Sequence, residues 1–184
     1  QRQMCIRDRY YSRVSRKSVH VSRFITTFIS GGMIVFIPVL LNFMMTTMFL
    51  PALNPVENGE FLNRGLSFMA DLYCNHIFIY TFIYMIQMFL YGGAFSVISL
   101  AVSFFLDNSF LTVITPFVGF YGIGVISTIC KNLFGTYSFS PMSIMCPSHL
   151  IMDQSLFAFI MEPVLVTLIS GIVFFVKGAD NEAL

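Results

Sequence analysis

One acidic residue lies within the long apolar stretches of this 184-residue chain. Glu162 falls about two turns into the last stretch and is followed directly by Pro163. An ionisable side chain inside a membrane is costly and usually faces a cavity or a partner, so Glu162 is a candidate for lining a transport path. Two simpler interpretations remain open: the carboxylate snorkels to the outer interface, or the helix begins only at Pro163, a residue favoured in a first turn.

Two amide side chains also lie within apolar stretches. Asn42 is in the first stretch and Gln87 is in the second. Amides in membrane helices commonly tie neighbouring helices together, with hydrogen bonds worth about 0.6–2 kcal/mol each. We treat Asn42, Gln87 and Glu162 together as the transport-path candidates.

The sequence lacks the motifs of several enzyme classes. It has no Gly-x-x-x-x-Gly-Lys-[Ser/Thr] phosphate loop, no His-Glu-x-x-His zinc helix and no Gly-x-Ser-x-Gly nucleophile elbow. No pair of acidic residues lies within the apolar stretches, which disfavours an intramembrane aspartyl protease. The cysteines show no metal-binding spacing, and a disulfide between Cys74 and Cys146 stays open. We therefore expect a chain without catalytic residues, metal or cofactor.

The composition indicates a membrane protein. The chain is 57% hydrophobic and only 10% charged, whereas soluble domains are about 25% charged. A helix that crosses a membrane needs about 20 mostly apolar residues, and four stretches within 24–177 qualify: 24–50, 77–106, 110–130 and 156–176. We predict an all-α integral membrane protein with four transmembrane helices. The net charge of +1 gives no reason to expect nucleic acid as a partner.

The distribution of basic residues predicts the orientation. Seven of the ten Lys and Arg residues precede residue 24, and in short loops these residues stay on the cytoplasmic side. The basic segment 10–23 and the tail 178–184 are therefore expected in the cytoplasm, so both termini are cytoplasmic. The loops 51–75 and 131–154 are then external.

Glycine and asparagine give local signals inside this plan. The second stretch is longer than one perpendicular crossing needs, so we expect a tilt or a kink, with Gly92-Gly93 as the weak point. Asn108 or Ser109 is expected to cap the third helix by accepting its unpaired N–H groups. Close helix contact is expected at three glycines of that helix: Gly119, Gly122 and Gly124.

Residues 1–9 are expected to be an artefact. Gln-Arg-Gln-Met-Cys-Ile-Arg-Asp at 1–8 reads as the translation of a common transposase adapter, CAG CGT CAG ATG TGT ATA AGA GAC, and Arg9 fits a junction codon. The rest of the chain is then expected to be the C-terminal fragment of a longer protein. The alternative is a native start that happens to match the adapter.

Three segments carry a family resemblance. They are Tyr11-Ser-Arg-Val-Ser-Arg-Lys followed by Phe24-Ile-Thr-Thr-Phe-Ile-Ser-Gly-Gly and Ile37-Pro38, then Phe89-Leu-Tyr-Gly-Gly-Ala-Phe-Ser-Val-Ile-Ser-Leu-Ala-Val-Ser-Phe-Phe, then Tyr137-Ser-Phe-Ser-Pro-Met. These segments resemble permease subunits of type-two ABC transporters from Gram-positive bacteria. The resemblance covers most of 11–177, and its motifs consist of common membrane residues.

The resemblance implies a fold and a set of partners. Such permeases have six helices, of which the last four would be present here, in the bacterial cytoplasmic membrane. They pair with a second permease subunit and with a separate cytoplasmic ATPase. Arg13, Arg16 and Lys17 are then candidates for contacting the ATPase. The residues alone support a second interpretation, attachment of this basic cluster to anionic membrane lipid at about 1 kcal/mol per residue.

The functional expectation is therefore a permease subunit, present as a fragment, of an ATP-driven exporter whose substrate is unknown. The alternative is a multi-span membrane protein that transports nothing, such as an immunity or assembly factor.

Overall fold

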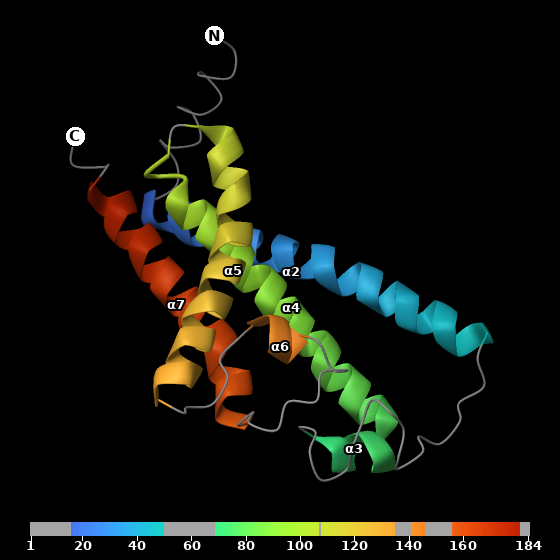
Figure 1. Cartoon of the computed structure of the whole chain (residues 1–184). Coiled ribbons are helices and arrows are strands. Elements are labelled where there is room, and N and C mark those ends of the chain that lie inside the picture. Colours follow the sequence, from blue (N-terminus) through green and yellow to red (C-terminus); the bar gives the residue numbers. More distant parts are fainter. Residues whose placement is uncertain (1–15, 50–68, 107, 135–140, 146–155, 181–184) are drawn as a thin grey trace.

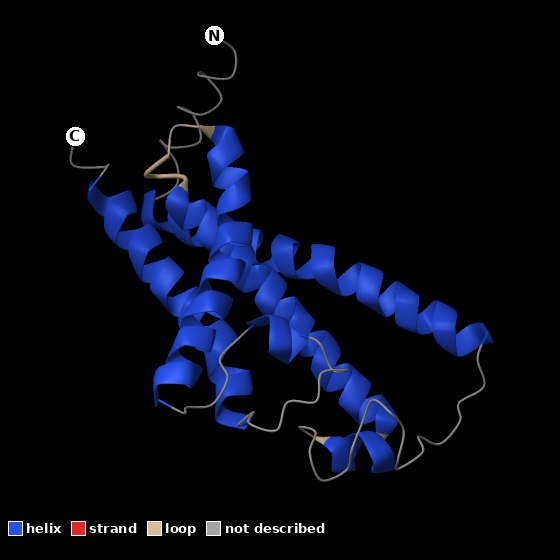
Figure 2. Cartoon of the chain, viewed as in Figure 1, coloured by secondary structure: helices blue, strands red, loops and turns tan. Residues whose placement is uncertain are grey.

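The computed structural model describes residues 16–49, 69–106, 108–134, 141–145 and 156–180. These residues form helices joined by turns, with no strand among them (Figure 2). Two of the helices are short, α3 (Ala70–Asn75) and α6 (Pro141–Met145). The other four are long (Figure 1): α2 (Arg16–Phe49), α4 (Ile77–Val102), α5 (Ser109–Phe134) and α7 (Leu156–Asp180).

The four long helices are long and apolar enough to cross a membrane. Their outer faces carry large apolar side chains, and only 11% of the apolar window of α2 and 6% of that of α5 are buried within the chain. Apolar side chains on the outer face are compatible with lipid. Each helix also satisfies its own backbone hydrogen bonds, as lipid requires. The predictions of an all-helical chain and of four membrane-length helices are confirmed, and the architecture is that of a multi-pass membrane protein.

Four helix ends differ from the predicted ones by several residues. Helix α5 runs to Phe134 rather than to residue 130, and α7 runs to Asp180 rather than to residue 176, so the helix extends into the predicted tail 178–184. Helix α2 begins at Arg16 rather than at residue 24, because residues 16–23 contain no proline or glycine to end a helix. Helix α4 ends at Val102 rather than at residue 106, and the N–H of Phe105 donates to the carbonyl oxygen of Val102 in the turn that follows (2.9 Å). Part of the basic segment therefore belongs to the first long helix.

A capped turn reverses the chain between α4 and α5. Asn108 Oδ1 accepts a hydrogen bond from the N–H of Phe110 (3.0 Å), which satisfies one of the unpaired donors at the start of α5. This confirms Asn108 as the cap. The reversal lays α5 against α4, where Ser99 Oγ donates to the carbonyl oxygen of Thr112 (2.8 Å).

Helix α4 lies at the centre of the bundle. It packs against α2, α7, α5, α3 and α6. By contrast, α2 and α7 meet over a short region, where Phe24 contacts the rings of Phe174 and Phe175 at centroid distances of 6.2 and 5.6 Å. Beyond this region α2 leaves α7 and packs against α4, and its far end, toward Phe49, lies away from α5 and α7 (Figure 1). The position of every long helix thus depends on α4.

Two glycine pairs bring α2 and α4 into close contact. A Cβ atom added to Gly92 would lie 2.8 Å from the carbonyl oxygen of Gly31, and one added to Gly32 would lie 2.8 Å from that of Phe89. Because the opposing atoms belong to the backbone, only glycine permits this approach. Gly92-Gly93 is therefore a packing seam within one continuous helix.

Two of the three glycines of α5, Gly119 and Gly122, do not provide the predicted close contact. A Cβ atom on Gly119 would make an ordinary contact with Ile98 Cδ1 (3.8 Å), and one on Gly122 would have nothing within 4 Å. Helix α5 instead meets α4 through larger side chains, since the rings of Phe95 and Phe120 lie 5.4 Å apart.

Four helix ends lie on one side of the bundle: the start of α2, the end of α4, the start of α5 and the end of α7 (Figure 1). The Phe174 ring of α7 contacts α2 and the turn that follows α4, with centroids 5.7 Å from His20 and 5.3 Å from Phe104. We call this the basic side, because it holds four of the five Lys and Arg residues in the described part of the chain: Arg16, Lys17, Arg23 and Lys177.

The glycine seam predicts a position-specific effect of added methyl groups. Gly92→Ala should lower the free energy of unfolding by roughly 1–3 kcal/mol, the range typical of overpacking. Gly122→Ala is the matched control and should leave it unchanged or raise it by up to about 1 kcal/mol, because alanine is the better helix former. Thermal unfolding of the purified chain in detergent measures both. Equal effects of the two substitutions would contradict the seam.

Candidate functional site

Glu162 of α7 is buried against α4. Its side chain is 8% exposed, and the side chain of Tyr91 is fully buried beside it. Tyr91 Oη donates a hydrogen bond to Glu162 Oε2 (2.8 Å). Helix α7 already begins at Leu156, so a helix that starts at Pro163 is wrong. Snorkelling of the carboxylate to the interface is also wrong, because the carboxyl group points into the bundle.

A second hydrogen bond lies one turn away on both helices. Gln87 Nε2 donates to the carbonyl oxygen of Phe159 (2.6 Å). Proline has no backbone N–H, so Pro163 cannot supply the helical hydrogen bond that this carbonyl, four residues earlier, would normally accept. The Gln87 amide replaces the missing donor from the neighbouring helix.

Helical spacing explains why these groups meet. Gln87 and Tyr91 are four residues apart on α4, and Phe159 and Glu162 are three residues apart on α7, so each pair lies on one face of its helix. The two polar faces are then pressed together by the α4–α7 contact. We call the group of Gln87, Tyr91, Phe159, Glu162 and Pro163 the α4–α7 site.

Apolar side chains enclose the α4–α7 site. The ring of Phe159 is buried and lies 5.6 Å from that of Tyr84. Ile144 of α6 is also buried and forms one cluster with Tyr91 and Phe159. Such surroundings give little stabilisation to a charge, and hydrogen bonds inside them are stronger than in water.

One of the two oxygen atoms of the Glu162 carboxyl group is unpaired in the described part of the chain. Glu162 Oε1 is buried and has no hydrogen-bond partner among the described residues. An ionised carboxylate can only accept hydrogen bonds, whereas a protonated one can also donate. The site can therefore bind a proton or interact with a ligand, but it is not a metal centre: in the described ranges, no three His, Cys, Asp or Glu side chains gather.

The structure brings together two of the three predicted path residues. Gln87 and Glu162 meet in the α4–α7 site, whereas Asn42 lies exposed on α2. There the carbonyl oxygen of Asn42 accepts a hydrogen bond from Thr46 Oγ1 of the same helix (2.7 Å). Asn42 therefore ties no helices together in the described part of the chain, which corrects the prediction.

The remaining candidates lie away from this site or outside the description. Arg16 and Lys17 begin α2 on the basic side. Arg13 falls outside the described residues, as does Cys146 of the proposed Cys74–Cys146 pair.

Sequence reasoning missed two members of the site. Tyr91 was overlooked because tyrosine is common in membrane helices and carries no charge. Phe159 takes part only through its backbone. Pro163 did offer a signal: a proline inside a helix leaves an unpaired carbonyl four residues earlier, and that carbonyl requires a donor from elsewhere.

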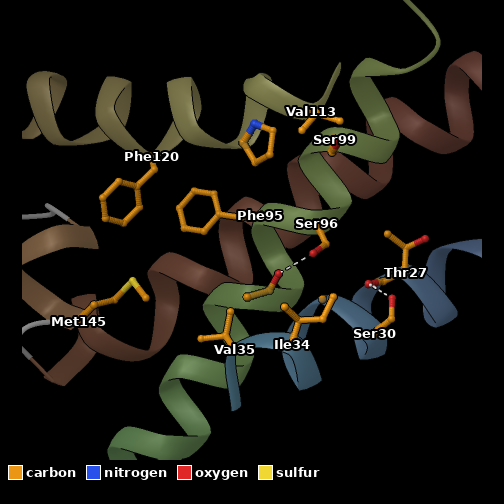
Figure 3. Close-up of a pocket in the computed structure, with 13 residues that line it drawn as sticks. Thr27, Ser30, Ile34, Val35, Phe95, Ser96, Ser99, Val113, Phe120 and Met145 are labelled. Atoms are coloured by element: carbon orange, nitrogen blue, oxygen red, sulfur yellow. Dashed lines mark hydrogen bonds between the residues drawn. The ribbon is translucent and has the colours of Figure 1, made fainter. Parts of the chain in front are cut away.

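A groove of about 480 Å³ lies between α2, α4 and α5, beside the glycine seam (Figure 3). Hydroxyl groups line it among apolar side chains. Ser96 Oγ donates to the carbonyl oxygen of Gly92 (2.8 Å), and Ser30 Oγ donates to that of Thr27 (3.1 Å). Since each hydroxyl hydrogen is already used within its own helix, these oxygens offer the groove acceptors rather than donors.

One aromatic layer separates the groove from Glu162. Phe95 lines the groove, and its ring stacks on that of Tyr91 with centroids 6.1 Å apart and an interplanar angle of 15°. Tyr91 in turn holds the Glu162 carboxyl group. A change in the groove that moves Phe95 would therefore reach the α4–α7 site directly.

Comparison with known protein families, with curated proteins and with solved structures finds no match to this chain.

The Gln87 hydrogen bond predicts a specific loss of stability. Gln87→Leu should lower the free energy of unfolding by about 1–3 kcal/mol, the cost of leaving a buried carbonyl without a donor. Asn42→Leu, the same change at an exposed amide, should have an effect within about 0.5 kcal/mol. Unfolding of the purified variants measures both.

A double-mutant cycle tests the reason for this loss. Pro163→Ala restores a backbone N–H at residue 163, which can donate to the carbonyl oxygen of Phe159. Gln87→Leu should therefore lower the free energy of unfolding by less in the Pro163→Ala background than in the wild type. The same loss of free energy in both backgrounds would show that the Gln87 amide does not replace the N–H that proline lacks.

Proposed function

We propose that this chain is a membrane-spanning permease subunit of an ATP-driven ABC transporter in a bacterial cytoplasmic membrane. The observation that supports it best is the burial of the Glu162 carboxyl group between two membrane-length helices. Ionisable residues at such positions are expensive and commonly mark substrate or ion pathways. Helix packing alone would be served better by apolar side chains of similar volume.

The α4–α7 contact suits a part that moves. Proline interrupts the hydrogen-bond ladder of α7 at the point where Gln87 and Tyr91 hold it. Two side-chain hydrogen bonds, each worth about 0.5–1.5 kcal/mol net, can break and re-form at a low cost. A rearrangement of α7 relative to α4 would then change the surroundings of Glu162.

The groove fits a substrate with apolar and polar parts. Its walls combine aromatic and aliphatic side chains with hydroxyl oxygens from α2 and α4. An amphiphilic molecule would place apolar groups on Phe95 and Phe120 and direct a donor toward Ser96. Lipid, peptide and drug all have such chemistry.

The partner subunits follow from the resemblance. The chain carries no phosphate loop, so ATP hydrolysis would reside in a separate subunit, and a second permease subunit would complete the membrane part. The basic side would face the cytoplasm, because lysine and arginine stay there. Arg13, Arg16 and Lys17 would then meet the ATPase, where charged rim contacts set the rate of encounter and the register.

Purification of the protein from its native membrane tests this proposal. We expect an ATPase with a Gly-x-x-x-x-Gly-Lys-[Ser/Thr] loop to co-purify and to hydrolyse ATP after reconstitution into liposomes. Glu162→Gln should lower that rate severalfold, because the glutamine side chain cannot exchange a proton or pair with a cation. Asn42→Leu is the control and should leave the rate unchanged.

The same preparation tests the basic segment. Arg16→Glu with Lys17→Glu should reduce the amount of ATPase recovered, whereas Lys131→Glu, at the opposite end of the bundle, should not. A chain that purifies without any ATP-binding protein, and whose gene starts near residue 10, would contradict the proposal and favour an immunity or assembly factor.

A further inference from the structure

The environment of Glu162 offers too little to hold a negative charge. The side chain is 8% exposed, one oxygen accepts a single hydrogen bond from Tyr91, and the other has no partner among the described residues. Carboxylates that stay ionised when buried are paired with a cation or accept several hydrogen bonds. One neutral hydroxyl group is a weak substitute for either.

The charged groups of the neighbouring helices lie elsewhere. Helix α4 presents the neutral Tyr91 and Gln87 to this part of α7, and residues 141–145 of α6 contain no titratable side chain. Helix α2 approaches α7 at Phe174, twelve residues from Glu162, or about 18 Å along a helix.

The basic residues of the described helices follow the same pattern. His20 and Arg23 belong to that distant region of α2. Lys177 is fifteen residues from Glu162 on α7 itself, about 22 Å along the helix, and its Nζ lies over the Phe105 ring. Lys131, the basic residue of α5, is exposed in the last turn of its helix.

We propose that Glu162 is a proton-binding site inside the membrane, occupied by a proton in the arrangement described here. In the neutral acid, Oε2 is the carbonyl oxygen that accepts the Tyr91 hydrogen bond, and Oε1 carries the proton. The O–H bond at Oε1 forms with a proton taken from water, and it breaks to return that proton to water. No other bond changes, and no oxidant or reductant is required.

The ligand set selects a proton over a metal ion. Calcium takes six to eight oxygen ligands, and magnesium demands an octahedron of six. The α4–α7 site offers one carboxyl group, one tyrosine hydroxyl and the amide oxygen of Gln87 among aromatic and aliphatic side chains, which is fewer oxygen ligands than either ion takes. A proton needs a single oxygen atom, and it removes the charge that makes burial expensive.

Release of the proton requires the contact to open. While Tyr91, Phe159 and Ile144 enclose the carboxyl group, water cannot solvate the anion. Separation of α4 from α7 at Pro163 would expose Glu162 to water and favour loss of the proton. This consequence rests on the proposed transport function, but the occupancy of the site in the closed arrangement does not.

Infrared spectroscopy of the full chain in lipid vesicles, without any ATPase, tests the proposal. At neutral pH the wild-type protein should show the carbonyl stretching band of a protonated carboxylic acid. Glu162→Gln, which mimics the neutral acid in shape, should lose this band. Tyr91→Phe should keep the band but shift it to higher frequency, because it removes the hydrogen bond to Oε2.

The same infrared measurement would also reveal an ionised Glu162. Loss of a carboxylate band in Glu162→Gln, with no change in the acid band, would show that Glu162 is ionised and would overturn the proposal. If Glu162→Gln fails to fold, isotope labelling of the glutamate side chains in the wild-type chain separates their infrared bands from those of the aspartates and shows how many glutamates are protonated. The chain has four glutamates, Glu57, Glu60, Glu162 and Glu182, and one should be protonated at neutral pH. Four ionised glutamates would overturn the proposal.

Discussion

In a helix that crosses a membrane, every polar group has to find its partner within the protein, and in this chain that requirement falls on α4. One part of α4 supplies Gln87 and Tyr91 to α7, where the Phe159 carbonyl and the Glu162 carboxyl group both need donors. Another part supplies glycine to α2, whose backbone would otherwise be held too far away. The two requirements are met within two turns of one helix, so α4 fixes the position of both neighbours.

The two contacts differ in how easily they change. The glycine seam depends on close packing of backbone atoms, and such packing resists small displacements. The α4–α7 contact depends on two side-chain hydrogen bonds across a proline. We therefore expect α2 and α4 to move as one unit and α7 to be the helix that shifts. The groove lies on the rigid pair, and Phe95 and Tyr91 connect it to the contact that can shift.

The sequence was sufficient for the helices but not for their pairing. Apolar stretches of membrane length revealed the four long helices, and Asn108 revealed the capped turn. Gln87 and Glu162 could be selected as polar residues in apolar surroundings. That they belong to one site could not be predicted, because it depends on which faces of α4 and α7 meet. The pairing of helix faces cannot be read from the apolar pattern of a single sequence.

The glycines illustrate the same limit. The sequence predicted close contact at Gly119 and Gly122 of α5, yet the glycines that lie at a close helix crossing are the pairs Gly31-Gly32 and Gly92-Gly93. Whether a glycine relieves a crowded contact is decided by the atoms opposite it. The prediction for Asn42 was wrong because a polar residue in an apolar stretch need not face another helix. Asn42 is exposed on α2 and lies outside the α4–α7 site.

The central claim is that Tyr91 and Glu162 are hydrogen-bonded to each other inside the bundle. A double-mutant cycle of Tyr91→Phe and Glu162→Leu, read as the free energy of unfolding in lipid or detergent, tests it most directly. Each single change should destabilise the chain, because it leaves a buried polar group alone, while the double change should recover much of the loss because no polar group is left unpaired. Losses that simply add would contradict the contact and the account built on it.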